Sequence, residues 1–271
     1  MLHSARMDRP DTAKRVAPRL SGVQIVEYDS TPDPAIYLAD DGTVSRRPLA
    51  VGDELALSLG ERRCAGRVLG DRHRRCDAAE TPRCQTHTDT WVCARCRGDC
   101  LKDEMDCHVS HDVYLAAFAP DTIKVGVTRT GRLNRRLREQ GADRGVRIHR
   151  VKNGRIAREI EAEIAEDIPD RVGVSPKIRS LTARVDRETW VDHIEQFSPA
   201  EHLVLTYPVS LEEPPIAETL ARGEIVGVKG RLVCLRWSGS TFVTDLQDLV
   251  GHHIQENTTP RAVQSGLGAF S

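Results

Sequence analysis

The hydrophobic pattern between residues 111 and 168 predicts the order strand, strand, helix, strand, helix. Two apolar runs, 113–118 and 123–128, are joined by the turn sequence APDT, which is typical of a hairpin. Residues 132–140 place Leu133 and Leu137 four positions apart and end at Gly141, as an amphipathic helix does. A third strand is expected over 145–151, and a second helix over 155–168 carries an isoleucine at every fourth position. We therefore expect a small α/β module over residues 111–200.

The flanking segments carry short apolar runs that predict strands. Residues 21–63 form an expected N-terminal β unit, and residues 201–256 form an expected C-terminal β unit. Within the latter, 224–237 is predicted as one long strand in which Gly227 and Gly230 mark bulges or close approaches. We expect the two β units to pack together in a barrel-like or sandwich arrangement. The overall class is α+β, with a polar leader over 1–20 and a disordered tail over 257–271.

Residues 64–110 break this pattern, because they hold seven of the eight cysteines and few apolar side chains. The chain has neither an apolar run of about 20 residues nor the apolar core of a secretory signal. We therefore expect a cytoplasmic protein, in which clustered cysteines are more typical of a metal site than of disulfides. Redox-active or reactive cysteines are the alternative.

The cysteine spacing predicts one or two structural Zn²⁺ ions in this zinc ribbon-like segment. Cys93 and Cys96 form a CxxC pair, which lets two thiolates reach the same ion, and Cys76 and Cys84 are the expected second pair. A second zinc site would use Cys100, Cys107, His108 and His111, and Cys64 with His73 would be a further contribution. Because the segment has little apolar surface to bury, metal binding is expected to supply its folding energy.

The charge is nearly balanced overall, with 39 Lys and Arg against 40 Asp and Glu, but it is unevenly placed. Residues 129–158 hold eleven Lys or Arg and two acids, and residues 62–75 hold six Arg and one acid. The balance argues against a uniformly basic nucleic-acid binder, whereas the two blocks favour an anionic partner on one face. Solvated arginine-rich surfaces are the alternative.

The α/β module resembles the GIY-YIG nuclease module at short motifs. DVY stands where GIY would and supplies Tyr114, while KVG stands for YIG, supplies Lys124 and Gly126, and is followed by Thr128. RLREQ resembles the helix motif, with Arg136 matched and Gln140 in place of a histidine, and AREIEAEI supplies Glu161. Lys124 also departs from the expected tyrosine, and the late asparagine of that module has no clear match.

That resemblance implies a three-stranded antiparallel sheet with helices and a phosphodiester-cleaving site. Tyr114 would activate the nucleophile, Arg136 would hold the scissile phosphate, and one Mg²⁺ or Mn²⁺ on Glu161 would neutralise the leaving oxygen. Gly126 would let the phosphodiester approach the sheet. Each residue also has a plainer interpretation: Tyr114 as a core aromatic, Arg136 as a surface partner of Glu139 or Asp143, and Glu161 as a solvated carboxylate.

The chain from about residue 20 also resembles the domain of unknown function 2797 family. Three blocks carry the resemblance: the cysteine-rich segment, the run HDVYLA to RLREQGAD, and GVKGRLVCLRW.

Three functions remain open. The first is nucleic-acid binding, with RNA favoured over DNA because no helix-turn-helix pattern is seen; its phosphate contacts would come from Arg129, Arg132, Arg135, Arg138 and Arg147. The second is a divalent-metal-dependent endonuclease of GIY-YIG type. The third is a zinc-stabilised adaptor for an acidic protein. The substitutions at Lys124 and Gln140 favour binding over cleavage.

Overall fold

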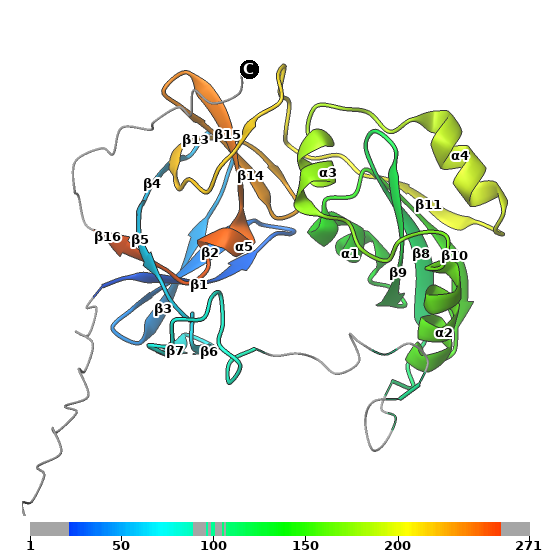
Figure 1. Ribbon diagram of the computed structural model, residues 1–271, viewed down its shortest axis with the longest axis horizontal. Coiled ribbons are helices and arrows are strands. Elements are labelled where there is room, and N and C mark those ends of the chain that lie inside the picture. The colour runs from blue at the N-terminus through cyan, green and yellow to red at the C-terminus, as the bar shows by residue number, and fades with distance from the viewer. Residues whose placement is uncertain (1–21, 89–95, 97–98, 101–104, 106, 256–271) are drawn as a thin grey trace, which may run out of the picture.

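The computed structural model describes residues 22–88, 96, 99–100, 105 and 107–255, and these form two parts that lie side by side (Figure 1). A β unit built from both ends of the chain lies beside an α/β module built from its middle. The expected leader and tail lie outside the described residues. None of the helices in the described part of the chain is long and apolar enough to cross a membrane.

The α/β module is built on a four-stranded antiparallel sheet in the order β11-β10-β8-β9. Its strands are β8 (His111–Phe118), β9 (Thr122–Arg129), β10 (Arg144–Val151) and β11 (Ala200–Val204). Its helices are α1 (Leu133–Gln140), α2 (Gly154–Ile164), α3 (Val174–Arg179) and α4 (Arg187–Glu195). Side chains of α1 pack on one face of the sheet, and those of α2 and α4 pack on the other. Every residue of β8 is therefore buried.

The predicted order of strands and helices over residues 111–168 is present, with one shorter helix. Helix α2 ends at Ile164 and not at residue 168. Ile168 is nevertheless buried in the same apolar cluster as Ala157, because the turn beyond α2 folds it back onto the sheet. The last of the four regularly spaced isoleucines is thus buried in the core although it lies beyond the end of the helix.

The β unit contains two sheets, and each combines strands from both ends of the chain. One has seven strands in the order β5-β16-β1-β2-β3-β7-β6, and the other has five in the order β12-β15-β14-β13-β4. The strands of the first half are β1 (Gln24–Asp29), β2 (Ala35–Asp40), β3 (Thr43–Pro48), β4 (Glu54–Ala56), β5 (Ser58–Arg62), β6 (Arg67–Leu69) and β7 (Arg72–Arg74). The later elements are β12 (Ile216–Ala217), β13 (Arg222–Lys229), β14 (Leu232–Trp237), β15 (Ser240–Asp245), α5 (Leu246–Leu249) and β16 (His252–Gln255).

The two flanks therefore share one hydrophobic core. Strand β16 pairs with β1 and β5, and β13 pairs with β4. The core contains Ile25, Ile36 and Leu55 from the first half together with Ile225 and Leu235 from the second. The N- and C-terminal segments thus form a single folding unit interrupted by the α/β module.

Two sequence predictions for the C-terminal segment are wrong. Residues 224–237 form a hairpin of β13 and β14, and not one strand, because Gly230 adopts a φ of 58° and reverses the chain. The C-terminal β unit also begins later than the predicted residue 201, because β11 pairs with β10 and makes the α/β sheet four-stranded instead of three-stranded. Gly227 does lie at a break in the pairing register of β13 and β14, as the predicted bulge requires.

The turn between β13 and β14 joins the two parts of the molecule. Lys229 is 3% exposed, and its Nζ donates to Asp143 Oδ1 at 2.7 Å and to Ser180 Oγ at 2.8 Å, both in the α/β module. A Cβ on Gly230 would lie 2.6 Å from the backbone nitrogen of Gly141 at the end of α1. The close backbone contact therefore requires glycine at position 230 and positions α1 against the β unit.

Candidate functional site

Four side chains from residues 64–87 bring their potential ligand atoms within 4.8 Å of one another. Cys64 follows β5, and the short hairpin of β6 and β7 returns the chain to Cys76. Cys84 and His87 lie in one turn, in which the backbone nitrogen of His87 donates to the Cys84 carbonyl oxygen at 2.9 Å. We call these four residues the Cys3His cluster.

The spacing inside the Cys3His cluster matches a tetrahedral zinc site. Zn–S bonds of about 2.3 Å and Zn–N bonds of about 2.0–2.1 Å place sulfurs about 3.8 Å apart and a sulfur and nitrogen about 3.6 Å apart. Cys76 Sγ and Cys84 Sγ are 3.9 Å apart, and His87 Nδ1 lies 3.5 Å from Cys64 Sγ and 3.2 Å from Cys84 Sγ. The cluster could therefore bind a metal ion such as zinc.

Two backbone N–H groups donate hydrogen bonds to the Cys64 sulfur. The amides of Gly66 and Cys84 lie 3.4 and 3.2 Å from Cys64 Sγ and donate to it. These two contacts fix the position of the Cys64 sulfur within the cluster. The surrounding apolar cluster is small, with Ala65 and Val26 among its buried members, so a metal would add the stability that burial does not supply here.

The Cys3His cluster contains Cys76 and Cys84, which are two of the four residues predicted for the first zinc site. Cys64 and His87 complete the cluster, whereas Cys93 lies outside the described residues. Cys96 does not contact the cluster, and its Sγ donates to the Asp99 carbonyl at 3.3 Å. The sequence prediction did not include His87, although Cys84-Gln-Thr-His87 has the same spacing as a CxxC pair and could have indicated it. The partner proposed for Cys64, His73, instead contacts the Ala65 carbonyl at 2.8 Å.

Of the four residues proposed for a second zinc, only Cys107 and His111 are shown close together. Cys107 and His111 both pack on Gly154, where an added Cβ would lie 3.0 Å from each side chain. Cys100 is exposed, and His108 Nε2 contacts the Met105 carbonyl. Within the described ranges, the Cys3His cluster is the one group of three or more side chains with metal-binding spacing.

In the α/β module, the strand pairing places Tyr114 of β8 directly opposite Gly126 of β9. A Cβ on Gly126 would lie 2.5 Å from the Tyr114 hydroxyl, so the tyrosine ring fills the space above the glycine. The glycine is therefore explained by the tyrosine, and not by the approach of a phosphodiester as the sequence suggested. Tyr114 is 1% exposed and receives a hydrogen bond from Gln140 Nε2 at 2.8 Å.

The environment of Tyr114 keeps its hydroxyl protonated. Burial raises the pKa of Tyr114, although the nearby Arg136 charge and the hydrogen bond from Gln140 act in the opposite direction. A phenol with a raised pKa is a poor general base at neutral pH. The interpretation of Tyr114 as a core aromatic therefore describes its surroundings well.

Lys124 shares the sheet face of Tyr114 and Gly126, because alternate residues of a strand point the same way. Its Nζ donates to the Asp170 carbonyl oxygen at 2.6 Å. Burial lowers the pKa of Lys124 to about 8, with the charge of Glu161 opposing and that of Arg136 adding to the shift. A lysine in this state exchanges its proton near physiological pH.

Arg136 and Glu161 lie on different helices and have different surroundings. Arg136 is half exposed on α1 and pairs with Glu139 at 3.3 Å, which is the partner that the plainer interpretation named. Glu161 is 8% exposed on α2, so it is not a solvated carboxylate, and it forms an ion pair with Arg158. The carboxylate that the resemblance assigns to a metal is thus already paired with a cation.

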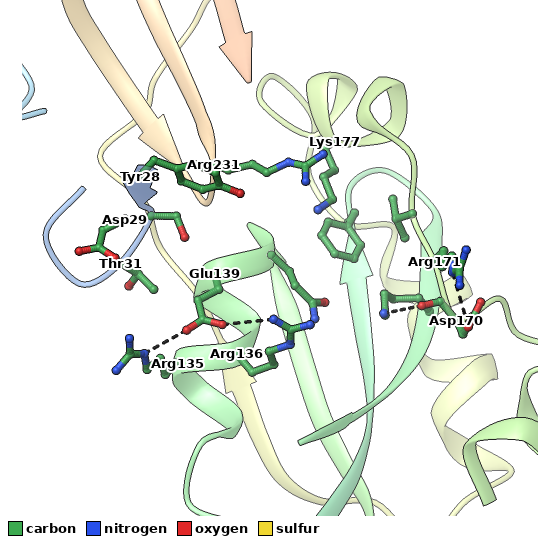
Figure 2. A pocket seen from close by; sticks show the side chains of 15 residues that line it. Tyr28, Asp29, Thr31, Arg135, Arg136, Glu139, Asp170, Arg171, Lys177 and Arg231 are labelled. Carbon is green, nitrogen blue, oxygen red and sulfur yellow. Dashed lines mark hydrogen bonds and ion pairs between the residues drawn. The ribbon is translucent and has the colours of Figure 1, made fainter. Parts of the chain in front are cut away.

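A cavity of about 590 Å³ opens where the α/β module meets the β unit (Figure 2). We call it the basic cavity, because six cationic and three acidic side chains are among the residues that line it. The cationic residues are Lys124, Arg135, Arg136, Arg171, Lys177 and Arg231, and the acidic residues are Asp29, Glu139 and Asp170. Tyr28, Ser30, Thr31, Phe118, Gln140 and Val172 complete the lining.

Only one of the five arginines predicted to contact nucleic acid lines this cavity. Arg135 does so, and its Nε donates to Glu139 at 3.0 Å. Arg132 lies 4.0 Å from the same carboxylate, while Arg147 pairs with Glu201 at 3.2 Å. Arg138 donates to the Thr206 carbonyl, and Arg129 is exposed at the end of β9. The basic block is therefore spread over several surfaces.

A family model described as Protein of unknown function (DUF2797) matches residues 52–254. The chain belongs to this family. The DUF2797 match contains the Cys3His cluster and all six cationic residues of the basic cavity, whereas Tyr28 to Thr31 on the cavity wall precede it. No curated protein and no solved structure matches the chain.

Proposed function

We propose that this DUF2797 protein binds nucleic acid through the basic cavity, with RNA ahead of DNA. The observation that carries the proposal is the cavity lining, in which cationic side chains outnumber acidic ones by six to three. Cationic side chains drawn together in a concave surface attract phosphate groups, and arginine suits them because it can donate two parallel hydrogen bonds. The Cys3His cluster would have a structural role in this proposal.

The contacts within the cavity support an anionic ligand. Arg135 and Arg136 share the single carboxylate of Glu139, so two guanidinium groups are held by one counter-charge (Figure 2). Lys124 donates to a carbonyl oxygen, and no carboxylate in the described part of the chain forms an ion pair with it. A phosphate entering here would gain charge-assisted hydrogen bonds from cations that are incompletely neutralised.

Binding can be tested with fluorescein-labelled 12-nucleotide RNA and DNA by fluorescence anisotropy. Arg136→Gln is expected to weaken RNA binding about tenfold and to lower the slope of log K against log salt by about one, because one phosphate contact is lost. Arg184→Gln is the matched control, since Arg184 is exposed in the loop between α3 and α4 and does not line the cavity.

The proposal fails if the wild-type protein retains neither RNA nor DNA at low salt. It also fails if Arg136→Gln and Arg184→Gln weaken binding equally, since a cavity-specific contact would then be excluded. In the first case, the adaptor for an acidic protein becomes the function to test.

A second proposed function is cleavage of the bound strand, and the lowered pKa of Lys124 favours it. The resemblance to the GIY-YIG module places Lys124 and Arg136 at reactive positions, and an amine with a pKa of about 8 can accept a proton near neutral pH. Tyr114 is buried and protonated, so Lys124 is the better base of the two. Arg158 pairs with the Glu161 carboxylate and would compete with Mg²⁺ or Mn²⁺ for it, which favours binding as the first proposal.

The pH dependence distinguishes the two functions, because binding affinity and cleavage rate are expected to change in opposite directions as the pH rises. Lys124 carries its charge below its pKa of about 8, so phosphate binding is expected to be strongest below pH 8 and to weaken as the pH rises through it. Cleavage with Lys124 as base requires the neutral amine and is expected to rise over the same interval. Anisotropy and gel-based cleavage assays from pH 6.5 to about 9.5, with Lys124→Met as the comparison, measure both. A rate unaffected by Lys124→Met would exclude this residue as the base.

A further inference from the structure

Lys177 and Arg231 lie side by side on one wall of the basic cavity although they come from different parts of the molecule. Lys177 belongs to α3 of the α/β module, and Arg231 lies in the turn between β13 and β14 of the β unit. Figure 2 shows their cationic ends next to one another, on the other side of the view from Arg135 and Arg136. The cavity thus has two groups of cations.

Like the first pair, this second pair of cations has one carboxylate partner for two positive charges. Lys177 Nζ lies 5.4 Å from the centre of the Phe118 ring, and among the described residues no carboxylate forms an ion pair with it. One Nη of Arg231 pairs with Asp245 at 2.8 Å, while its Nε is buried and has no hydrogen-bond partner among the described residues. Donors therefore remain on both side chains.

The electrostatics agree with this geometry. Burial and then the charges of Arg231 and Lys124 lower the pKa of Lys177 to about 8. Cations held this close destabilise one another, and a bound anion would remove the repulsion. An anion bound here would contact both parts of the molecule at once.

We propose that Lys177 and Arg231 together bind a second phosphate, so that the ligand is a strand with at least two phosphate groups that spans the cavity. The inference rests on the proposed nucleic-acid binding and specifies its ligand as a polynucleotide segment. The Arg135 and Arg136 group holds one phosphate, and the Lys177 and Arg231 group holds another farther along the strand. The strand thereby bridges α1, α3 and the turn between β13 and β14.

Oligomer length provides the test. Binding of fluorescein-labelled RNA of 2, 4, 8 and 12 nucleotides is measured by anisotropy for the wild-type protein, Lys177→Gln, Arg231→Gln and the control Arg184→Gln. Lys177→Gln is expected to weaken 12-nucleotide binding about tenfold, to lower the salt slope by about one, and to change dinucleotide binding less than twofold. A dinucleotide has one internal phosphodiester, so it can occupy only one subsite. Because Arg231 also pairs with Asp245, thermal unfolding is used to check that Arg231→Gln is folded. If this variant is unfolded, the conclusion is drawn from Lys177→Gln alone.

The outcomes separate this inference from the proposed function. If Arg136→Gln weakens 12-nucleotide binding but Lys177→Gln binds with the wild-type Kd and salt slope, the second subsite is excluded and nucleic-acid binding stands. If Lys177→Gln weakens dinucleotide and 12-nucleotide binding equally, the two groups form one subsite and the inference is again wrong. If the wild-type protein binds neither RNA nor DNA of any length, both proposals are wrong.

Discussion

Cys84→Ser is expected to remove one equivalent of zinc from the purified protein and to lower its free energy of unfolding by at least about 3 kcal/mol. Cys84 Sγ lies 3.9 Å from Cys76 Sγ and 3.2 Å from His87 Nδ1, so it is central to the Cys3His cluster. Serine keeps the size of the side chain but is a much weaker zinc ligand than a thiolate. Elemental analysis gives the zinc content, and urea unfolding gives the stability.

Cys100→Ser is the control for this experiment, because Cys100 is exposed and lies outside the cluster. It is expected to retain at least one equivalent of zinc and the wild-type unfolding midpoint. Wild-type protein with less than about half an equivalent of zinc, or Cys84→Ser protein with unchanged zinc, would contradict the assignment.

Lys229→Met is expected to lower the free energy of unfolding by about 2–4 kcal/mol. The ammonium of Lys229 is buried between the two parts of the molecule and donates to Asp143 Oδ1, Ser180 Oγ and the Ser180 carbonyl oxygen. Methionine preserves the length of the chain but leaves these acceptors without their donor. The Asp143 side chain is 22% exposed, so water satisfies part of its charge and the lower half of the range is expected.

The measurement is urea unfolding at neutral pH with Lys152→Met as the control, since Lys152 is exposed. Asp143→Asn tests the pairing, because the double variant is expected to lose less than the sum of the two single changes. Full additivity would show that Lys229 and Asp143 do not stabilise the fold as a pair.

The periodic segments of the chain were predictable from sequence because their pattern repeats many times. Leu133 and Leu137 are buried on α1, and the strands on either side of the APDT turn pair as a hairpin. The hairpin at residues 224–237 was missed because its reversal depends on one glycine with a positive φ, Gly230, inside an apolar run. Strand β11 was misplaced because which sheet edge a strand joins is decided by tertiary contacts.

The residues of the candidate sites were predictable only in part, as Cys76 and Cys84 were named together and His87 was missed. The Cys84 and His87 turn is local, and its spacing was available to be recognised. Cys64 was named as a possible ligand but with the wrong partner, His73, because cysteine identity alone does not say which side chains the fold brings together. The wall of the basic cavity formed by Lys177 and Arg231 is likewise created by packing of two separate parts of the chain.

The central claim, that nucleic acid binds in the basic cavity, is tested most directly by photocrosslinking. Purified protein is irradiated with a 4-thiouridine-containing 12-nucleotide RNA at low salt, and the modified peptides are identified by mass spectrometry. We expect adducts on segments that line the cavity, around residues 118–140, 170–177 and 231, and we expect unlabelled RNA to compete them away. Adducts confined to segments outside the cavity, or the absence of any competed adduct, would contradict the claim.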